Sequence, residues 1–156
     1  MCIICRNEYP RDTERVYGKH CQCEYLTQIS NILHLKVLDC SGCPDITEIP
    51  NMKGLKELNC MNCPNLTKIP NIEGLKYLYC GDCPNLTEIP NIKGLIQLQC
   101  GNCRNLTEIP IIEGLKYLSC GSCPNLAAIR NIPGLKELWC GGCPNLTKIP
   151  NIKKLI

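Results

Sequence analysis

A leucine recurs every 20 residues along most of the chain, and this period constrains the fold more than any other feature. The leucines of the period are Leu35, Leu55, Leu75, Leu95, Leu115 and Leu135. Six units with the consensus LKxLxCxxCPNLTxIPNIxG run from Leu35 to Lys154. A period of this length is typical of stacked supersecondary units, each of which needs its neighbours to bury its apolar side. The sequence therefore predicts a repeat solenoid.

An imperfect unit precedes the six regular ones. The stretch CEYLTQISNILH from Cys23 aligns without gaps to CPDITEIPNMKG from Cys43. In that register the imperfect unit spans roughly residues 15–34, and His20 takes the place of the first cysteine of the pair. We therefore expect an N-terminal cap with a cysteine and histidine cluster at 1–22, followed by the solenoid at 23–156.

Each unit has room for one short strand and a return segment. In LKYLYC we place the strand at Tyr77–Tyr79, and alternation then sends Leu78 and Cys80 inward. Pro84 and Pro90 fix φ and remove hydrogen-bond donors, which favours turns and extended backbone over helix on the return. Strands of successive units should then pair side by side in one parallel sheet.

The pattern LxxLxCxxCxxL, as in LKYLYCGDCPNL from Leu75, resembles the leucine-rich repeat. The remainder, LTEIPNI, is similar to the 20-residue units of bacterial effector leucine-rich repeat proteins, and the match recurs six times over residues 35–154. The Ile-, Asn-, Lys- and Cys-rich composition also looks like leucine-rich arrays encoded by amoebal giant viruses. The resemblance implies an arc with a parallel β-sheet on its concave face, a convex side of turns and extended segments with little helix, and function on the concave face.

Every regular unit carries a CxxC pair. Two adjacent pairs, such as Cys40 and Cys43 with Cys60 and Cys63, match the spacing of a four-cysteine zinc site. The repeat imposes this spacing wherever both positions are cysteine, so the spacing says little about metal. The first cysteine can instead pack as a small buried apolar side chain, and the second can support the turn backbone. We expect a structural thiol ladder, with metal binding and disulfides as alternatives.

A second cysteine cluster lies before the regular units and is not explained by them. Cys2, Cys5, His20 and Cys23 form two short-spaced pairs separated by 14 residues, and Cys21 is an alternative ligand. Such spacing is typical of zinc sites. We interpret the cluster either as a cap held by one structural zinc or as an unmetallated cap lined by cysteines.

The outward positions of the predicted sheet differ from unit to unit, and aromatic side chains gather there. Tyr and Trp are frequent anchors of protein interfaces, although exposed aromatic residues can also simply support β-pairing. The candidate partner-binding residues on this face are Glu57, Asn59, Tyr77, Tyr79, Gln97, Gln99, Tyr117 and Trp139.

Composition argues against several classes of partner and location. A net charge of +3 is too small to indicate nucleic acid, and no apolar run approaches the roughly 18 residues of a membrane span. The N-terminal MCIICRNEYPRDTER lacks the pattern of a secretory signal. Sixteen cysteines without export indicate a reducing, intracellular location, which for a viral protein means the host cytoplasm or the virion.

No nucleophile and base arrangement typical of catalysis surrounds either histidine, so we predict that the protein is not an enzyme. The expected function is a protein–protein interaction module that binds a protein partner through the concave sheet face. The alternatives are a structural component of a viral particle or assembly, and a thiol-rich metal-binding protein. The closing NIKKLI stops at the start of another unit with no polar cap. Either the chain is a fragment or this apolar end packs against another molecule, such as a second copy.

Overall fold

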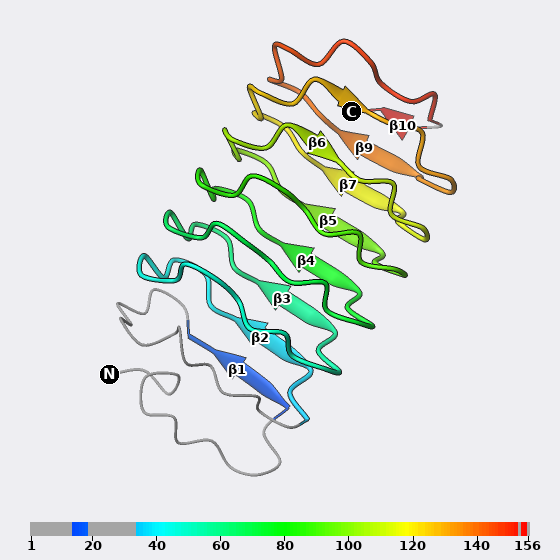
Figure 1. The fold of residues 1–156 in the computed structure, drawn as a ribbon. Helices are drawn as coiled ribbons and strands as arrows, with labels where there is room; N and C mark the ends of the chain where they lie inside the picture. Colours follow the sequence, from blue (N-terminus) through cyan, green and yellow to red (C-terminus); the bar gives the residue numbers. More distant parts are fainter. Residues whose placement is uncertain (1–13, 19–33, 153, 156) are drawn as a thin grey trace.

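A computed structural model describes residues 14–18, 34–152 and 154–155 of the chain. Over these residues the protein is a parallel-strand solenoid in which the strands of successive coils lie side by side (Figure 1). No helix occurs in the described part of the chain, and therefore none there could cross a membrane. The predicted solenoid, with a parallel sheet and a return of turns and extended backbone, is confirmed.

The main sheet contains eight strands in the order β1-β2-β3-β4-β5-β7-β9-β10. Their bounds are β1 Arg15–Tyr17, β2 Val37–Asp39, β3 Glu57–Asn59, β4 Tyr77–Tyr79, β5 Gln97–Gln99, β7 Tyr117–Ser119, β9 Glu137–Trp139 and β10 Lys154–Leu155. A separate two-stranded sheet on the return path pairs β6 Glu108–Ile109 with β8 Ala128–Ile129. The strand predicted at Tyr77–Tyr79 has the bounds of β4.

The interior consists of apolar columns, in which equivalent side chains of successive coils lie one against the next. Leu78, at the centre of β4, is fully buried and lies opposite Leu58 and Leu98. Burial depends on having a coil on either side, as the isoleucine column on the return path shows. Ile129 is 2% exposed, whereas the equivalent Ile149 in the last described coil is 43% exposed. Stacking, and not the single coil, therefore builds the core.

Two turns in each coil place a residue in the left-handed region of φ. The residue before the second cysteine is one of them, with φ of 56° at both Asn62 and Asp82. Asn and Asp tolerate this region better than other side chains. The other turn is at the end of the unit, where Gly94 has φ of 78°. His34 takes this glycine position at the start of the regular units, with φ of 86°.

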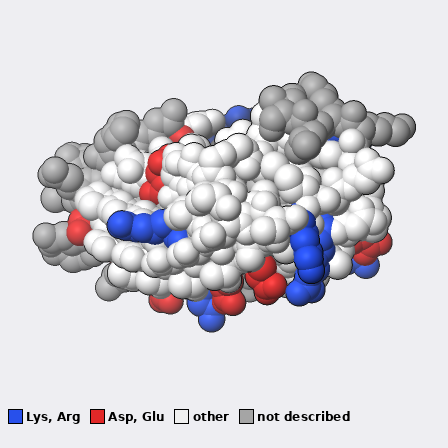
Figure 2. Space-filling view, turned by 90° about the horizontal axis from the view of Figure 1, so that it is seen from above, with Lys and Arg blue, Asp and Glu red and all other residues white. Residues whose placement is uncertain are grey.

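Charged side chains on the return path lie in mixed order along the stack. Lys93 and Glu113 form an ion pair of 3.8 Å, and Arg130 and Glu108 form one of 3.4 Å, all strongly exposed. Figure 2 likewise shows acidic and basic side chains next to one another on the face it views, without a patch of one sign. Such exposed pairs contribute little to stability.

The pairing of β1 with β2 differs from the register predicted for the imperfect unit. Val16 lies opposite Leu38, which is 38 − 16 = 22 residues away. Leu38 lies opposite Leu58, which is 58 − 38 = 20 residues away, and this spacing continues through β9. The imperfect unit is therefore two residues longer than the gapless alignment implied, and its strand lies within 1–22.

The same offset changes which residue stands for the first cysteine of the pair. Cys63 donates its S–H to the carbonyl of Cys40, and Cys43 donates to the carbonyl of Gly18. Gly18 thus occupies the position equivalent to Cys40, and the prediction that His20 takes that position is wrong. The physical reason is that the gapless register would place Gly18, which has no side chain, opposite Leu38. The observed register places Val16 there, and its side chain is buried in the core.

Candidate binding surface on the main sheet

Two columns of side chains cover the outer face of the main sheet, because the first and third residues of each strand point away from the core. We call these two columns the outer face. The first column is Arg15, Val37, Glu57, Tyr77, Gln97, Tyr117 and Glu137, and the second is Tyr17, Asp39, Asn59, Tyr79, Gln99, Ser119 and Trp139. The structure therefore brings all eight residues predicted to bind a partner onto one surface.

The candidate side chains of the outer face are only partly exposed to solvent. Tyr77 is the most exposed of the eight candidates, at 37%, and the other seven are half-buried. Burial raises the pKa of the Tyr79 phenol, and the nearby Glu57 carboxylate raises it further. Tyr79 therefore keeps its proton at neutral pH and can donate a hydrogen bond.

An open hollow of about 350 Å³ lies on the outer face around Ser119. It spans β5, β7 and β9, and its lining residues are Gln97, Leu98, Gln99, Tyr117, Ser119 and Trp139. Ser119 has the smallest side chain of its column and lies between Gln99 and Trp139 in the pairing register. The hollow exists because a small residue is surrounded by large ones. Its walls are two aromatic rings, and its polar groups are two carboxamides and a hydroxyl.

The outer face continues onto β1 with two residues that the sequence analysis missed. Tyr17 is 54% exposed, and its hydroxyl accepts a hydrogen bond of 3.4 Å from the Arg15 guanidinium. Both were missed because the gapless alignment placed this strand two residues too late. The alternation in Arg15–Tyr17, with a valine between two polar side chains, was the signal that could have found them.

Asp39 differs from the other members of its column because it is buried and supports the adjacent turn. Its carboxylate accepts hydrogen bonds from the Ser41 hydroxyl at 2.7 Å and from the Ser41 backbone N–H at 3.1 Å. Asn59 accepts a similar bond from the Met61 N–H at 3.2 Å. In these two coils the side chain of the second column supports the adjacent turn. In the later coils the second column consists of Tyr79, Gln99, Ser119 and Trp139.

A lysine column borders the outer face at the start of the strands, and two of its members cap turns. The Lys56 ammonium donates to the carbonyl of Gly74 at 3.3 Å, and Lys76 donates to that of Gly94 at 3.1 Å. Each bond ties the start of one unit to its own last turn, which leads into the next coil. Ile96 interrupts this column between Lys76 and Lys116.

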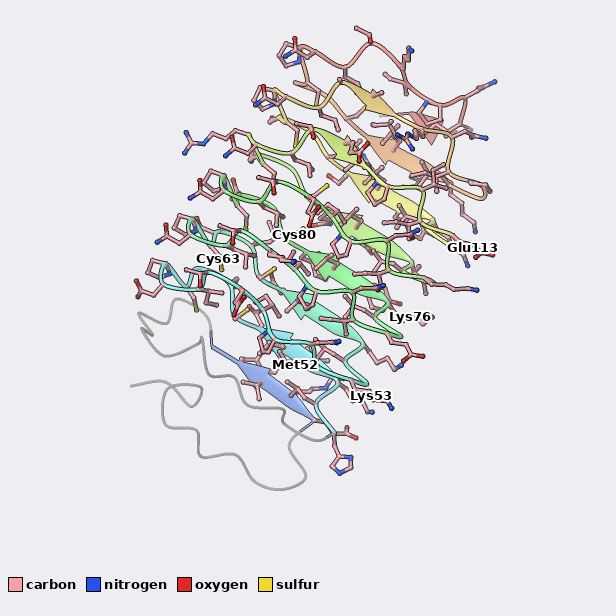
Figure 3. The ribbon with its side chains drawn as sticks, in the orientation of Figure 1. Met52, Lys53, Cys63, Lys76, Cys80 and Glu113 are labelled. Atoms are coloured by element: carbon pink, nitrogen blue, oxygen red, sulfur yellow. The ribbon has the colours of Figure 1, made fainter. Side chains whose placement is uncertain are left out.

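Two cysteine columns run through the interior next to the outer face, and Figure 3 labels one member of each, Cys80 and Cys63. The second cysteine of each pair donates its S–H to a backbone carbonyl of the preceding coil. The sulfur-to-oxygen distances lie between 3.2 and 3.4 Å, and the donors are Cys43, Cys63, Cys83, Cys103, Cys123 and Cys143. This inward, turn-supporting role is the one predicted for the second cysteine.

Burial raises the pKa of several thiols in these columns, such as Cys60, Cys80 and Cys100, and keeps these thiols protonated at neutral pH. Desolvation raises the pKa of Cys83 to about 12 and that of Cys103 to about 11. Desolvation also raises the pKa of Cys80 well above its ordinary value, and the nearby Cys103 thiol adds to the shift. A protonated thiol can donate a hydrogen bond but is a poor metal ligand and a poor nucleophile.

The described cysteines form two continuous columns, as the predicted thiol ladder requires. The cysteines at 40–143 are all free thiols. Within the described ranges, no group of three or more His, Cys, Asp or Glu side chains is placed to hold a metal ion. The predicted zinc ligands Cys2, Cys5, His20, Cys21 and Cys23 lie outside the described residues, so that site stays a prediction.

The outer face can thus present aromatic rings and hydrogen-bonding groups on a surface fixed by the strands beneath it. Backbone bonds of 2.8 Å, from Cys60 N–H to the Tyr79 carbonyl and from Cys80 N–H to the Gln99 carbonyl, continue the ladder past the strand ends. Function is inferred from this geometry. Comparisons of the chain with protein-family models, with curated proteins and with solved structures found no match.

Proposed function

We propose that the protein is a non-enzymatic interaction module that binds a protein partner through the outer face, the surface that the leucine-rich repeat resemblance predicts to be concave. The observation that carries the proposal is the aromatic-walled hollow around Ser119. Partly buried Tyr and Trp side chains around a hollow are the arrangement in which interface residues contribute most to affinity.

The backbone beneath the outer face supports this role because it is already ordered. The strands from β2 to β9 in the main sheet are hydrogen-bonded on both sides. Cys83 adds a bond to the preceding coil at Cys60, and Lys76 adds a bond to the turn at Gly94, which leads into the next coil. A surface that does not have to be ordered on binding loses less entropy when a partner docks. The outer face therefore resembles a preformed platform.

Differences among the coils also favour a recognition role for the outer face. The inward positions repeat the same residue types, as in Leu58, Leu78 and Leu98. The outward positions opposite one another change chemistry at each step, as in Gln99, Ser119 and Trp139. A repeated core with a varied surface is what a module needs to keep its fold while it specifies one partner.

Partner capture from extracts of the native source tests the proposal. We expect the Tyr79→Ala, Trp139→Ala double variant to lose capture by well over about 30-fold, because truncation of each such anchor costs about 2 kcal/mol or more, which is about 30-fold in affinity. A matched control truncates two exposed residues on the return path, Thr87→Ala with Glu88→Ala. Equal capture by both variants, with unchanged circular dichroism, would place the partner elsewhere.

A further inference from the structure

We infer that the hollow around Ser119 is a binding site for an arginine side chain. Under the proposed function, on which the source of this arginine rests, the side chain belongs to the protein partner and anchors it on the outer face. The hollow has about 350 Å³ of open space, which suits a single large side chain better than a whole peptide segment.

The aromatic walls are the first feature that favours a guanidinium group. Tyr117 and Trp139 both line the hollow, from the adjacent strands β7 and β9. Trp is the aromatic side chain that attracts cations most strongly, followed by Tyr. The planar guanidinium can stack on such rings and is only weakly hydrated, whereas the lysine ammonium is compact and strongly hydrated. The walls therefore favour arginine over lysine.

The hydrogen-bonding groups of the hollow match the same side chain. Gln97 and Gln99 contribute carboxamide oxygens, and Ser119 contributes a hydroxyl oxygen, all of which can accept hydrogen bonds. Arginine has five N–H donors in a plane and no acceptor. An aliphatic side chain in the hollow would cover these polar groups without bonding them, which is unfavourable.

Charge around the hollow points in the same direction. None of the six lining residues is charged, and Glu137 lies directly opposite Tyr117 and two residues before Trp139. Lys116 and Lys136 directly precede β7 and β9, and neither of them lines the hollow. A carboxylate in the hollow would have no cation in the lining to pair with.

Trp139 provides the readout, because it is the chain's only tryptophan and it lines the hollow. The probes are the peptides acetyl-Ala-X-Ala-amide with X as arginine, citrulline, lysine or glutamate, titrated against the whole chain. Citrulline has the shape of arginine without its charge. We expect the arginine peptide to change Trp139 emission and to bind about tenfold more tightly than the citrulline peptide.

Two leucine substitutions separate the hollow from the rest of the molecule. Ser119→Leu fills the hollow and should abolish the preference for arginine. Thr87→Leu places the same side chain at an exposed position on the return path, outside the lining, and should preserve it. Equal affinity for arginine and citrulline, no response to either, or an arginine preference that survives Ser119→Leu would overturn the inference.

The peptide titration and the partner capture fail independently. If capture depends on Tyr79 and Trp139 but the peptides show no arginine preference, the inference fails and the proposed function stands. If the arginine peptide binds but capture ignores the outer face, the proposed function fails and the hollow remains an arginine site.

Discussion

The Cys83 thiol donates its hydrogen to the backbone carbonyl of Cys60, 3.2 Å away in the preceding coil. The same bond recurs one coil later, from Cys103 to the carbonyl of Cys80 at 3.3 Å. A thiolate or a metal-bound sulfur could not donate such a bond. The second cysteine of each pair therefore joins neighbouring coils as a protonated thiol, and the first cysteine is buried as a small apolar side chain.

The two cysteines of one pair should respond differently to the same substitution. In Cys83→Ser the hydroxyl can take over the bond to the Cys60 carbonyl, so we expect a loss of less than about 1 kcal/mol. In Cys80→Ser the hydroxyl is buried where the thiol donates no hydrogen bond among the described residues, and we expect a loss of about 1–3 kcal/mol. Urea unfolding of the two variants measures the difference. A larger loss for Cys83→Ser would contradict the roles assigned to the columns.

Stability should fall at alkaline pH because burial raises the pKa of column thiols such as Cys83 and Cys103. Both states keep the thiols protonated below the unfolded value of about 8.5, so stability is full there. Above it the unfolded state releases protons while the folded state retains them, up to about 12 for Cys83 and about 11 for Cys103. Each such thiol lowers the unfolding free energy by about 1.4 kcal/mol per pH unit in this window.

Urea unfolding at about pH 8, about pH 9 and about pH 10 checks this dependence. Cys83→Ser is the matched control, because it removes one thiol and should make the decline shallower by about 1.4 kcal/mol per pH unit. Constant stability over this range would show that the thiols are not protonated and buried as described.

Two glycines at equivalent turn positions should differ sharply in their tolerance of alanine. A Cβ at Gly121 would lie 2.9 Å from the carbonyl oxygen of Gly141, whereas a Cβ at Gly141 meets no atom within 4 Å. We expect Gly121→Ala to cost about 1–3 kcal/mol through overpacking, and Gly141→Ala to change stability by less than about 0.5 kcal/mol. Thermal unfolding of the pair measures this. Similar melting temperatures would mean that the coils are spaced more widely than the structure shows.

The 22-residue offset between β1 and β2 can be tested at neighbouring positions of β1. Val16 is buried opposite Leu38, and Tyr17 is 54% exposed. We expect Val16→Asp to cost about 3 kcal/mol or more by burying a charge, and Tyr17→Asp to cost less than about 0.5 kcal/mol. Hydrogen exchange of the Val37 amide, which donates to the Glu14 carbonyl at 3.0 Å, reports on this coil. Protection that survives Val16→Asp would support the gapless register, because that register places Gly18 and not Val16 opposite Leu38.

Much of the fold could be predicted from the sequence because the same pattern of apolar, turn and outward residues recurs in six units. The strand at Tyr77–Tyr79, the inward Leu78 and the turn at Gly94 follow from alternation and from residues that favour one backbone conformation. The β1 register could not be predicted in this way, because two extra residues in one coil leave no repeated pattern to align. There the inward position of Val16 was decided by packing.

The candidate site was only partly readable from the sequence. Alternation placed Tyr117 and Trp139 on one face, but the hollow depends on the small size of Ser119 between Gln99 and Trp139. That relationship joins residues of three coils and appears in no motif. Likewise, the bond from Lys56 to the Gly74 carbonyl depends on the distance between coils, which the sequence does not state.

The metal content of the purified whole chain tests the structural role of the cysteine columns most directly. The Cys2→Ser, Cys5→Ser variant removes two ligands of the predicted N-terminal zinc site, so that any zinc beyond about one ion per chain belongs to the columns. Elemental analysis of this variant should find no bound zinc, and the column thiols should react slowly with a thiol reagent until the protein is unfolded. One or more zinc ions per adjacent pair of coils, with thiols that become reactive once a chelator is added, would contradict the account.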